Sequence, residues 1–336
     1  LKMFKILAVA AMATAALAGN VRPRDVYESA FADHVAQFKV TIKDGKDFVA
    51  RLQAFADNYD LIEAHNADPN ATYKMALNKF SHLTLDEFHS AVNMNGIKKP
   101  NMRKSNKVHT APSVKGSDSV DWSTTAAVTP VKNQGNCGSC WSFSATGGLE
   151  GAYYNAHGTG TSLSEQNLVS CDTVDSGCNG GWMDDAFNFA KGNGGLCSED
   201  SYPYTSGTTG SDGSCSKSCT VVSGSAPSSW TDVEAGSVSA MESAVEQQPV
   251  SIAIQANQPA FQSYSSGVLT GKCGQRLDHG VLAVGYGTDN GVNYWTVKNS
   301  WGDSWGESGY IRLSRDVSQR QGQCGILSGP PSYPNM

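Results

Sequence analysis

The segment QGNCGSCWSFSA, from Gln134 to Ala145, decides the interpretation of this chain. Cys140 begins a run to Tyr154 that has the length of a helix and offers apolar side chains for packing. A thiol is a poor nucleophile and a thiolate a good one, and the N-terminal amides of a helix favour an anion. The segment therefore predicts a reactive cysteine at a helix N-terminus. A Cys-x-x-Cys spacing, here with Cys137, also occurs in redox and metal sites.

The second half of the chain contains short β-branched and aromatic runs bounded by Gly and Asn, which are typical of strands. Two such regions carry polar side chains of interest: His279, which can take and return a proton, lies in LDHGVLAVGYG, and Asn299, which can accept a hydrogen bond, lies in WTVKNSWG. A helical half followed by a strand-rich half predicts two lobes with a cleft between them. The expected strands are PVSIAIQA from Pro249, GVLAVGYG from Gly280, NYWTVKNS from Asn293 and GYIRLS from Gly309.

These segments together resemble the papain-like cysteine proteases, most closely the cathepsin L branch. The resemblance implies an α+β fold of two lobes, a helical lobe that carries Cys140 and a β-barrel-like lobe that carries His279 and Asn299. Gln134 before the Cys-x-x-Cys pair and Trp141 after it favour this interpretation over a redox or metal pair. The resemblance runs from about 120 to 334 and rests on SVDWSTTAAVTPVKNQG, LSEQNLVSC, GCNGGWMDDAF, SYPYTS, LDHGVLAVGYG and VKNSWG.

The resemblance implies a catalytic role for several of these residues. Cys140 would be the nucleophile, His279 its proton partner and imidazolium, and Asn299 the acceptor that orients the imidazole. The side-chain amide of Gln134 and the backbone N–H of Cys140 would stabilise the oxyanion. Trp301 would shield the hydrogen bond between His279 and Asn299 from water. The expected reaction is acyl transfer through a thioester followed by hydrolysis, with no metal or organic cofactor.

Substrate binding is expected along a glycine segment and in a neighbouring pocket. Gly180 and Gly181 would present backbone to an extended peptide, where side chains would obstruct a strand-like contact. The pocket for the second residue before the scissile bond has no acid at its base, so we expect an apolar residue such as Leu or Phe there. The resemblance places Trp182, Met183, Ala253, Leu277, Gly280 and Gly329 around this pocket, and it adds Asp278 and Trp301 to the substrate-binding residues.

The stretch between Cys178 and Cys197 is short and lacks the His-rich insertion that blocks the cleft in dipeptidases of the family. Endopeptidase activity on proteins and peptides is therefore expected.

The chain has nine cysteines, all of them after Val120. An odd number leaves at least one thiol over, and a disulfide framework implies an oxidising compartment. The resemblance implies the pairs Cys137 with Cys178, Cys171 with Cys215, and Cys273 with Cys324, and it leaves Cys197 and Cys219 as an extra pair. The partners Cys215 and Cys219 could be exchanged. Cys140 then stays free.

The first residues look like a secretory signal peptide. Lys2 and Lys5 precede the apolar run 6–17, and small residues stand at Ala16 and Ala18. The apolar run is shorter than the roughly 20 residues that a bilayer requires, so we expect cleavage near Ala18 and no membrane span in the mature form. A signal peptide at 1–18 predicts the secretory pathway, with a lysosome, a vacuole or the extracellular space as destination.

Residues 19–112 are expected to form an inhibitory propeptide and residues 113–336 the protease domain. Apolar residues recur at helical spacing from 26 to 88, and the composition then shifts to a polar connector between 92 and 119. Processing is expected between Val108 and Ser119. The resemblance implies that the propeptide passes backwards through the cleft as an intramolecular inhibitor. Its inhibitory pattern, usually written ERFNIN, is matched by Asp47 in place of Glu, Arg51, Phe55, Asn58, Ile62 and Asn66.

A second propeptide pattern, Gly-x-Asn-x-Phe-x-Asp, stands here as Ala76, Asn78, Phe80 and His82. A histidine changes charge near pH 6.5 and an aspartate near pH 4. The substitution predicts that the precursor activates at milder acidity than its relatives. Asn70-Ala71-Thr72 is a glycosylation sequon whose use stays open.

Composition excludes some functions and leaves two alternatives. Of the 336 residues, 39% are hydrophobic and 17% charged, as in globular proteins, and no basic patch suggests nucleic-acid binding. A monomer is expected. A protease-inhibitor function would fit a chain that ended before Cys140, and this chain does not. An acyl transferase or peptide ligase with the same triad remains an alternative.

Overall fold

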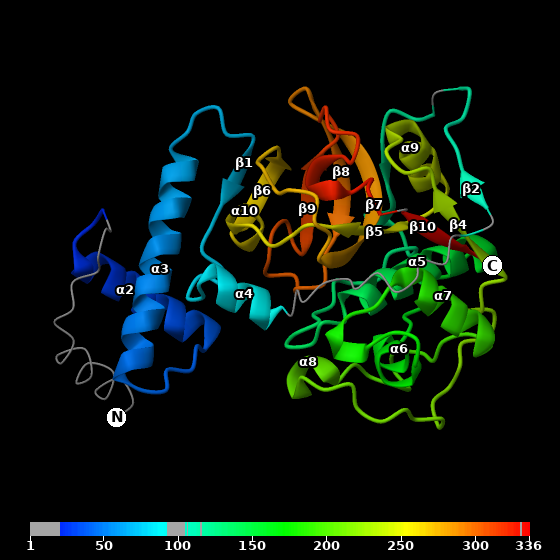
Figure 1. Cartoon of the computed structure of the whole chain (residues 1–336), viewed down its shortest axis with the longest axis horizontal. Coiled ribbons are helices and arrows are strands. Elements are labelled where there is room, and N and C mark those ends of the chain that lie inside the picture. Colours follow the sequence, from blue (N-terminus) through cyan, green and yellow to red (C-terminus); the bar gives the residue numbers. More distant parts are fainter. Residues whose placement is uncertain (1–20, 93–104, 106, 115, 330) are drawn as a thin grey trace.

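The computed structural model describes residues 21–92, 105, 107–114, 116–329 and 331–336. The chain extends from a pair of helices at one end, through a sheet, to a second group of helices (Figure 1). No helix in the described part of the chain is long and apolar enough to span a bilayer. The expected signal peptide and residues 93–104 of the expected propeptide lie outside the described residues.

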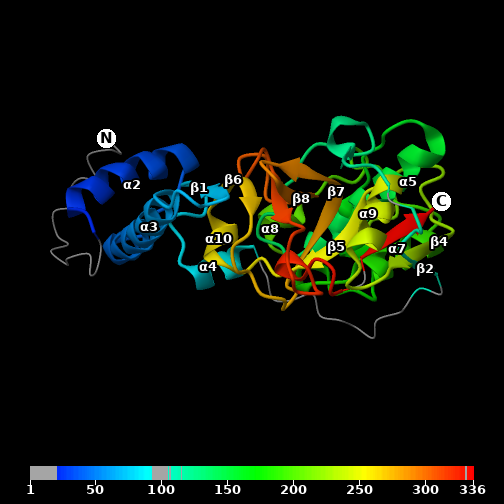
Figure 2. The same ribbon diagram turned by 90° about the horizontal axis from the view of Figure 1, so that it is seen from above.

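The N-terminal helices form a small unit with its own core. Helix α2 covers Arg24–Phe38 and α3 covers Gly45–Asn66, which begins where the carboxylate of Asp44 accepts hydrogen bonds from two backbone N–H groups. Seen from above, the two helices lie at the opposite end of the molecule from β2 and β4 (Figure 2). Their buried side chains include Tyr27, Phe31, Phe48, Leu52, Phe55 and Ala56.

The chain then crosses onto the rest of the molecule through two very short strands and a capped helix. Strand β1, Tyr73–Met75, pairs antiparallel with β6, Tyr264–Leu269. Helix α4, Leu85–Ala91, begins with a capping box in which Thr84 and Glu87 satisfy each other's backbone N–H groups. Strand β2, Val108–His109, pairs parallel with β4, Ser229–Val233.

Helices predominate between residues 140 and 209. The helix expected from Cys140 is present as α5 and continues to His157, where Gly158 ends it in a left-handed conformation. Its side chains Trp141, Ala145 and Leu149 join the core of this lobe. The lobe also contains α6 Glu165–Cys171, α7 Met183–Gly192 and α8 Ser206–Thr209, with a short 3₁₀ helix at Gly177–Asn179. A second 3₁₀ helix, Trp122–Thr124, contacts β7 of the sheet instead.

The strands of the described residues form one sheet in the order β1-β6-β9-β8-β7-β5-β10-β4-β2, with β3 also paired to β7. The four strands expected from the sequence are confirmed as β5, β7, β8 and β9. Helix α9, Val238–Gln247, contacts β7 and β4, and α10, Pro259–Gln262, contacts α4. The remaining bounds are β3 Val120–Asp121, β5 Val250–Ile254, β7 His279–Asp289, β8 Val292–Lys298, β9 Tyr310–Ser314, η3 Gln323–Gly325 and β10 Ser332–Asn335.

Helix α5 packs closely against the sheet because it presents glycines there. A Cβ on Gly147 would lie 2.6 Å from Leu282 of β7, and one on Gly151 would lie 2.6 Å from Pro249 before β5. The N-terminus of α5 therefore meets the beginning of β7, so that Cys140 lies beside Gly280. The α+β arrangement of a helical lobe against a strand-rich lobe is confirmed, and the junction of the two lobes brings the expected site residues together.

Candidate active site

Cys140 lies at the N-terminus of α5 and is the only cysteine without a disulfide among the nine, all of which are described. The backbone N–H of Gly280 points at its sulfur at 3.3 Å. Burial raises the pKa of the thiol to about 11, while the N–H groups of Gly280 and Trp141 act in the opposite direction. The helix N-terminus therefore favours a thiolate, but the cover over the site favours the neutral thiol.

His279 begins β7 and is fully buried. Its Nε2 lies 2.8 Å from Oδ1 of Asn299, and its Nδ1 has no hydrogen-bond partner among the described residues. Burial lowers the pKa of His279 to about 4, and the hydrogen bond to Asn299 opposes this shift. The imidazolium expected from the sequence is thus disfavoured in the covered site. Neither the His279 imidazolium nor the Cys140 thiolate would be hydrated there, so burial favours the neutral form of each.

Trp301 covers the imidazole. Its ring stacks on His279 with centroids 4.8 Å apart and an interplanar angle of 24°. Trp301 also contacts two aromatic rings of the N-terminal part. Its ring makes edge-to-face contacts with Phe80 and Phe88, with ring centroids 5.8 and 5.4 Å apart. Asn299 therefore binds the imidazole in a position that Trp301 shields, and the N-terminal part covers Trp301 in turn.

Gln134 is held by contacts on both ends of its amide. Its Oε1 accepts a hydrogen bond from the hydroxyl of Ser300 at 2.7 Å. Its Nε2 donates to the carbonyl of Cys137 at 3.0 Å and to the carbonyl of Val92 at 3.1 Å. Val92 follows α4, so a carbonyl from the N-terminal part occupies the donor that was expected to bind an oxyanion.

Two further residues of this site were missed from the sequence. Tyr204 stands in SYPYTS, and its hydroxyl contacts the Ser139 hydroxyl at 2.6 Å and donates to the Gln134 carbonyl at 2.9 Å. Ser300 fixes the Gln134 amide and follows Asn299 directly in the chain. The VKNSWG segment contains Ser300, but nothing in its spacing indicates a contact with a residue more than 160 positions earlier.

The residues expected around the substrate pocket converge in the structure. A Cβ on Gly329 would lie 2.9 Å from Leu277 and 3.1 Å from the ring of Trp182. Ala253 of β5 pairs with Gly280 of β7. Met183 begins α7, and it shares one buried cluster with Trp182 and Ala253, against which Leu277 packs.

The glycine segment has the backbone that its sequence suggests. Gly180 has a φ of +105°, which side chains disfavour. A Cβ on Gly181 would lie 2.6 Å from both the ring of Trp141 and the carboxyl carbon of Asp175, so glycine is required there. Asp278 is tied to the backbone, because its Oδ1 accepts from Ala256 N at 2.7 Å, and burial raises its pKa to about 7.

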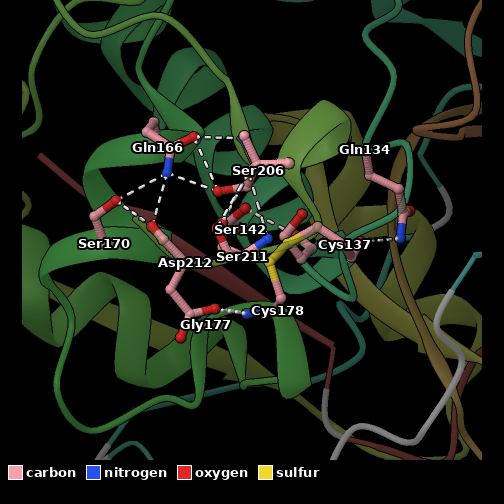
Figure 3. The surroundings of a disulfide bond; sticks show 12 residues. Gln134, Cys137, Ser142, Gln166, Ser170, Gly177, Cys178, Ser206, Ser211 and Asp212 are labelled. Atoms are coloured by element: carbon pink, nitrogen blue, oxygen red, sulfur yellow. Dashed lines mark hydrogen bonds between the residues drawn. A yellow bond between two sulfur atoms is a disulfide. The ribbon is translucent and has the colours of Figure 1, made fainter. Parts of the chain in front are cut away.

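The structure has disulfides between the pairs that the resemblance implies: Cys137–Cys178, Cys171–Cys215, Cys197–Cys219 and Cys273–Cys324. The first one ties the turn before α5 to the glycine segment. Figure 3 shows a polar network around it, in which Nε2 of Gln166 donates to Ser170, Ser206 and the Asp212 carbonyl. Asp212 also accepts from Cys178 N at 2.6 Å. This network was not predicted, because its members meet only in the folded chain.

The geometry and the comparisons with known proteins agree. Residues 116–333 match the model of the papain family of cysteine proteases, and residues 31–88 match the cathepsin propeptide inhibitor domain I29. The chain belongs to the papain family of cysteine proteases, and its N-terminal part is an inhibitory propeptide domain. The resemblance described from the sequence is thereby confirmed.

Individual proteins sharpen this assignment. The chain is 45% identical over 289 residues to cysteine proteinase RD21A of Arabidopsis thaliana, a match that covers 84% of this chain and 61% of that protein. The chain thus spans about three fifths of that relative's length. Two solved precursors are similar: the proform of the ragweed pollen allergen Amb a 11 (TM-score 0.84, 34% identity, 94% of this chain and 86% of that one) and the recombinant stem bromelain precursor (TM-score 0.83, 37% identity, 92% and 99%).

Proposed function

We propose that this protein is a cysteine endopeptidase, made as a latent zymogen, which hydrolyses peptide bonds in proteins. One observation carries the proposal: the sulfur of a free cysteine at a helix N-terminus accepts the N–H of Gly280, the residue that follows a buried histidine whose Nε2 is bound to Asn299. A disulfide-rich framework supports a place in the secretory pathway, with a lysosome, a vacuole or the extracellular space as destination. We propose that it acts as a monomer.

The proposed mechanism uses the two nitrogens of His279 differently. With Nε2–H held by Asn299, the free Nδ1 is the nitrogen available to take the proton of Cys140. The thiolate then attacks the substrate carbonyl, and the oxyanion binds the Gln134 amide and the backbone N–H of Cys140. The imidazolium returns the proton to the leaving amine, and a thioester remains. A water molecule, deprotonated by His279, hydrolyses the thioester and regenerates the thiol.

We attribute latency to the contacts of the propeptide with these same groups. The Val92 carbonyl binds the Gln134 amide, and Phe80 and Phe88 cover Trp301. Removing this cover would restore hydration to Cys140 and His279, which would lower the pKa of the thiol and raise that of the imidazole. The Cys140 thiolate and the His279 imidazolium then form as an ion pair only after the propeptide leaves.

We place the propeptide at 19–112 and the protease domain at 113–336, with processing between Val108 and Ser119. Support comes from exposure: the described residues of 111–119 lie on the surface between β2 and β3. An exposed segment between two short strands is a good protease substrate.

We propose an apolar side chain, such as Leu or Phe, in the second substrate position before the scissile bond. Trp182, Ala253, Leu277 and Gly329 surround the pocket with apolar groups. The nearby acid, Asp278, is bound to the Ala256 backbone, and burial favours its neutral form up to about pH 7. A substrate arginine would therefore find no ready charge partner at acidic pH.

Labelling and turnover test the proposal together. The full chain is incubated at acidic pH with a Phe-Arg or Leu-Arg amide substrate, with and without a thiol-directed epoxide, and the product is examined by mass spectrometry. We expect hydrolysis and a single label on Cys140, with both lost in Cys140→Ala. A label on another cysteine, activity in Cys140→Ala, or preferential transfer to an added amine would contradict the assignment.

A further inference from the structure

Two aspartates lie buried beneath the glycine segment of the cleft. Asp172 follows α6 directly and Asp175 stands three residues later, with exposed fractions of only 6% and 8%. Carboxylates are rarely buried without a partner, because they lose the hydration of their charge. The contacts of these two side chains therefore indicate what they do.

Each carboxyl group uses one oxygen to hold backbone. Oδ1 of Asp172 accepts hydrogen bonds from Val174 N at 2.8 Å and Asp175 N at 3.4 Å. Oδ1 of Asp175 accepts from Trp182 N at 2.8 Å, on the far side of the loop. The second oxygen of each, Oδ2, is buried and has no hydrogen-bond partner within the described ranges. Two buried acceptors without a donor are satisfied when the groups share one proton.

The electrostatic surroundings favour such sharing. The two carboxyl groups lie within hydrogen-bonding reach of each other, and Asp185 of α7 faces them as a further acid. Burial, and next the charge of Asp172, raise the pKa of Asp175 to about 9, and burial also raises the pKa of Asp172. From acidic to neutral pH, the pair therefore keeps a proton.

The pair supports the backbone that faces the substrate. The carboxyl carbon of Asp175 lies where it would be 2.6 Å from a Cβ on Gly181, so the carboxyl group packs directly against this glycine. Trp182, whose N–H it binds, follows in the chain and contributes its ring to the pocket beside Gly329. The loop is closed by Ser176 N donating to the Gly180 carbonyl at 2.9 Å. A displacement of Asp175 would thus move the segment 180–182.

We propose that Asp172 and Asp175 form a proton-sharing pair that positions the Gly180–Trp182 backbone for substrate binding, and that losing the shared proton weakens substrate affinity. The inference rests on the proposed peptidase function. Two adjacent buried carboxylates repel each other, and the loop 176–182, which Asp175 holds through Trp182 N and packs against at Gly181, would shift to separate them. Both aspartates are positioning residues, since they reach the substrate only through the loop.

The test separates KM from kcat across pH, using enzyme activated from the full chain and an amide substrate. We expect the wild-type KM to rise about tenfold between pH 7 and 9.5, as for the loss of one well-formed hydrogen bond. Asp175→Asn should have a KM that changes less than twofold over this range. Its amide oxygen still accepts from Trp182 N, and its NH₂ group replaces the shared proton by donating to Asp172. The kcat profile, which depends on Cys140 and His279, should be the same in both enzymes.

Asp172→Asn serves as the second variant, because it removes the same charge from the other side and should also flatten the KM profile. Asp200→Asn, at an exposed position, is the matched control and should follow the wild type. KM profiles of Asp175→Asn and Asp172→Asn that coincide with the rising wild-type curve would overturn the proposal, as would a flat wild-type KM. Absent turnover and absent epoxide labelling of Cys140 in the wild type would instead contradict the peptidase function.

Discussion

The propeptide and the protease domain are stabilised by different means. All nine cysteines lie after Val120, and four disulfides staple that part of the chain. The propeptide has no cysteine and depends on a small aromatic core and on surface contacts. It carries instead five of the seven histidines, namely His34, His65, His82, His89 and His109. The protease part is thus cross-linked by disulfides, whereas the propeptide is held by non-covalent contacts alone.

The histidines connect the propeptide's core to its contact with the protease. His34 of α2 and His82, in the turn before α4, face each other with Nε2 and Nδ1 3.1 Å apart. The rings of Phe38 and Phe55 pack against His34. The loss of either neutral imidazole would therefore disturb both the helix pair and the turn that leads to Phe88.

The expectation that His82 changes charge near pH 6.5 is wrong for the folded precursor. Burial lowers the pKa of both His34 and His82 to about 4, helped for His82 by the charge of Arg51, while Glu87 and Asp47 act in the opposite direction. A histidine with a folded pKa below its unfolded value of about 6.5 stabilises the fold fully above that value. This stability is lost as the pH falls from about 6.5 towards 4, because the unfolded segment binds protons first.

The largest expected effect concerns Gln134, which serves both parts. Gln134→Ala removes the side-chain oxyanion donor and the hydrogen bond to Val92, so we expect kcat to fall by about 10² to 10³-fold. The propeptide should lose only about 1 kcal/mol of binding, the usual value of one neutral hydrogen bond. Turnover of the activated enzyme and the thermal melting of the precursor measure the two effects.

Asn136→Ala changes a neighbouring amide in the same turn and is the matched control. A kcat loss below tenfold in Gln134→Ala would show that its amide does not bind the oxyanion. A large drop in precursor melting would show instead that Gln134 mainly holds the propeptide.

The sequence carries a stronger signal for the candidate site than for the attachment of the propeptide, for a physical reason. Cys140, His279 and Asn299 stand in long local patterns, and strands such as β7 have continuous apolar runs. Strands β1 and β2 contain only three and two residues, and each forms because an edge strand of the protease offers partners. Neither strand has an internal pattern, so both were missed.

The same limit applied to groups whose properties depend on burial. The pKa shifts of His82 and Asp175 arise from what the folded chain packs around them, which no motif encodes. Similarly, the Val92 carbonyl reaches the Gln134 amide through the path of α4 across the site. The sequence predicts which residues take part in the proposed reaction, and the structure supplies the contacts to which we attribute latency.

An intermediate effect is expected at Phe88, which joins the propeptide to the protease through Trp301. The Phe88 ring is fully buried, so Phe88→Ala leaves a cavity in its place. We expect this change to weaken the binding of the propeptide over Trp301 by about 3 kcal/mol. The site would then open more often, so labelling of Cys140 by an epoxide at pH 7 should be about 100-fold faster in the intact precursor. The exposed Leu61 of α3 provides a control, since Leu61→Ala removes apolar volume without opening the site. An unchanged labelling rate in Phe88→Ala would mean that other contacts keep the site closed.

The smallest and most specific effect is expected from His82→Asp, which restores the usual residue of the propeptide pattern. An aspartate here would face Arg51 and a protonated His34, so it would gain an ion pair in mild acid where the present histidine pair loses stability. We expect the midpoint of self-processing, followed by the loss of full-length chain against pH, to move down by about one pH unit. His157→Asp, an exposed change at the end of α5, should leave the midpoint in place. Identical profiles for the wild type and His82→Asp would mean that acid acts on the disulfide-stapled protease rather than on the propeptide, which would reverse the comparison between the two parts.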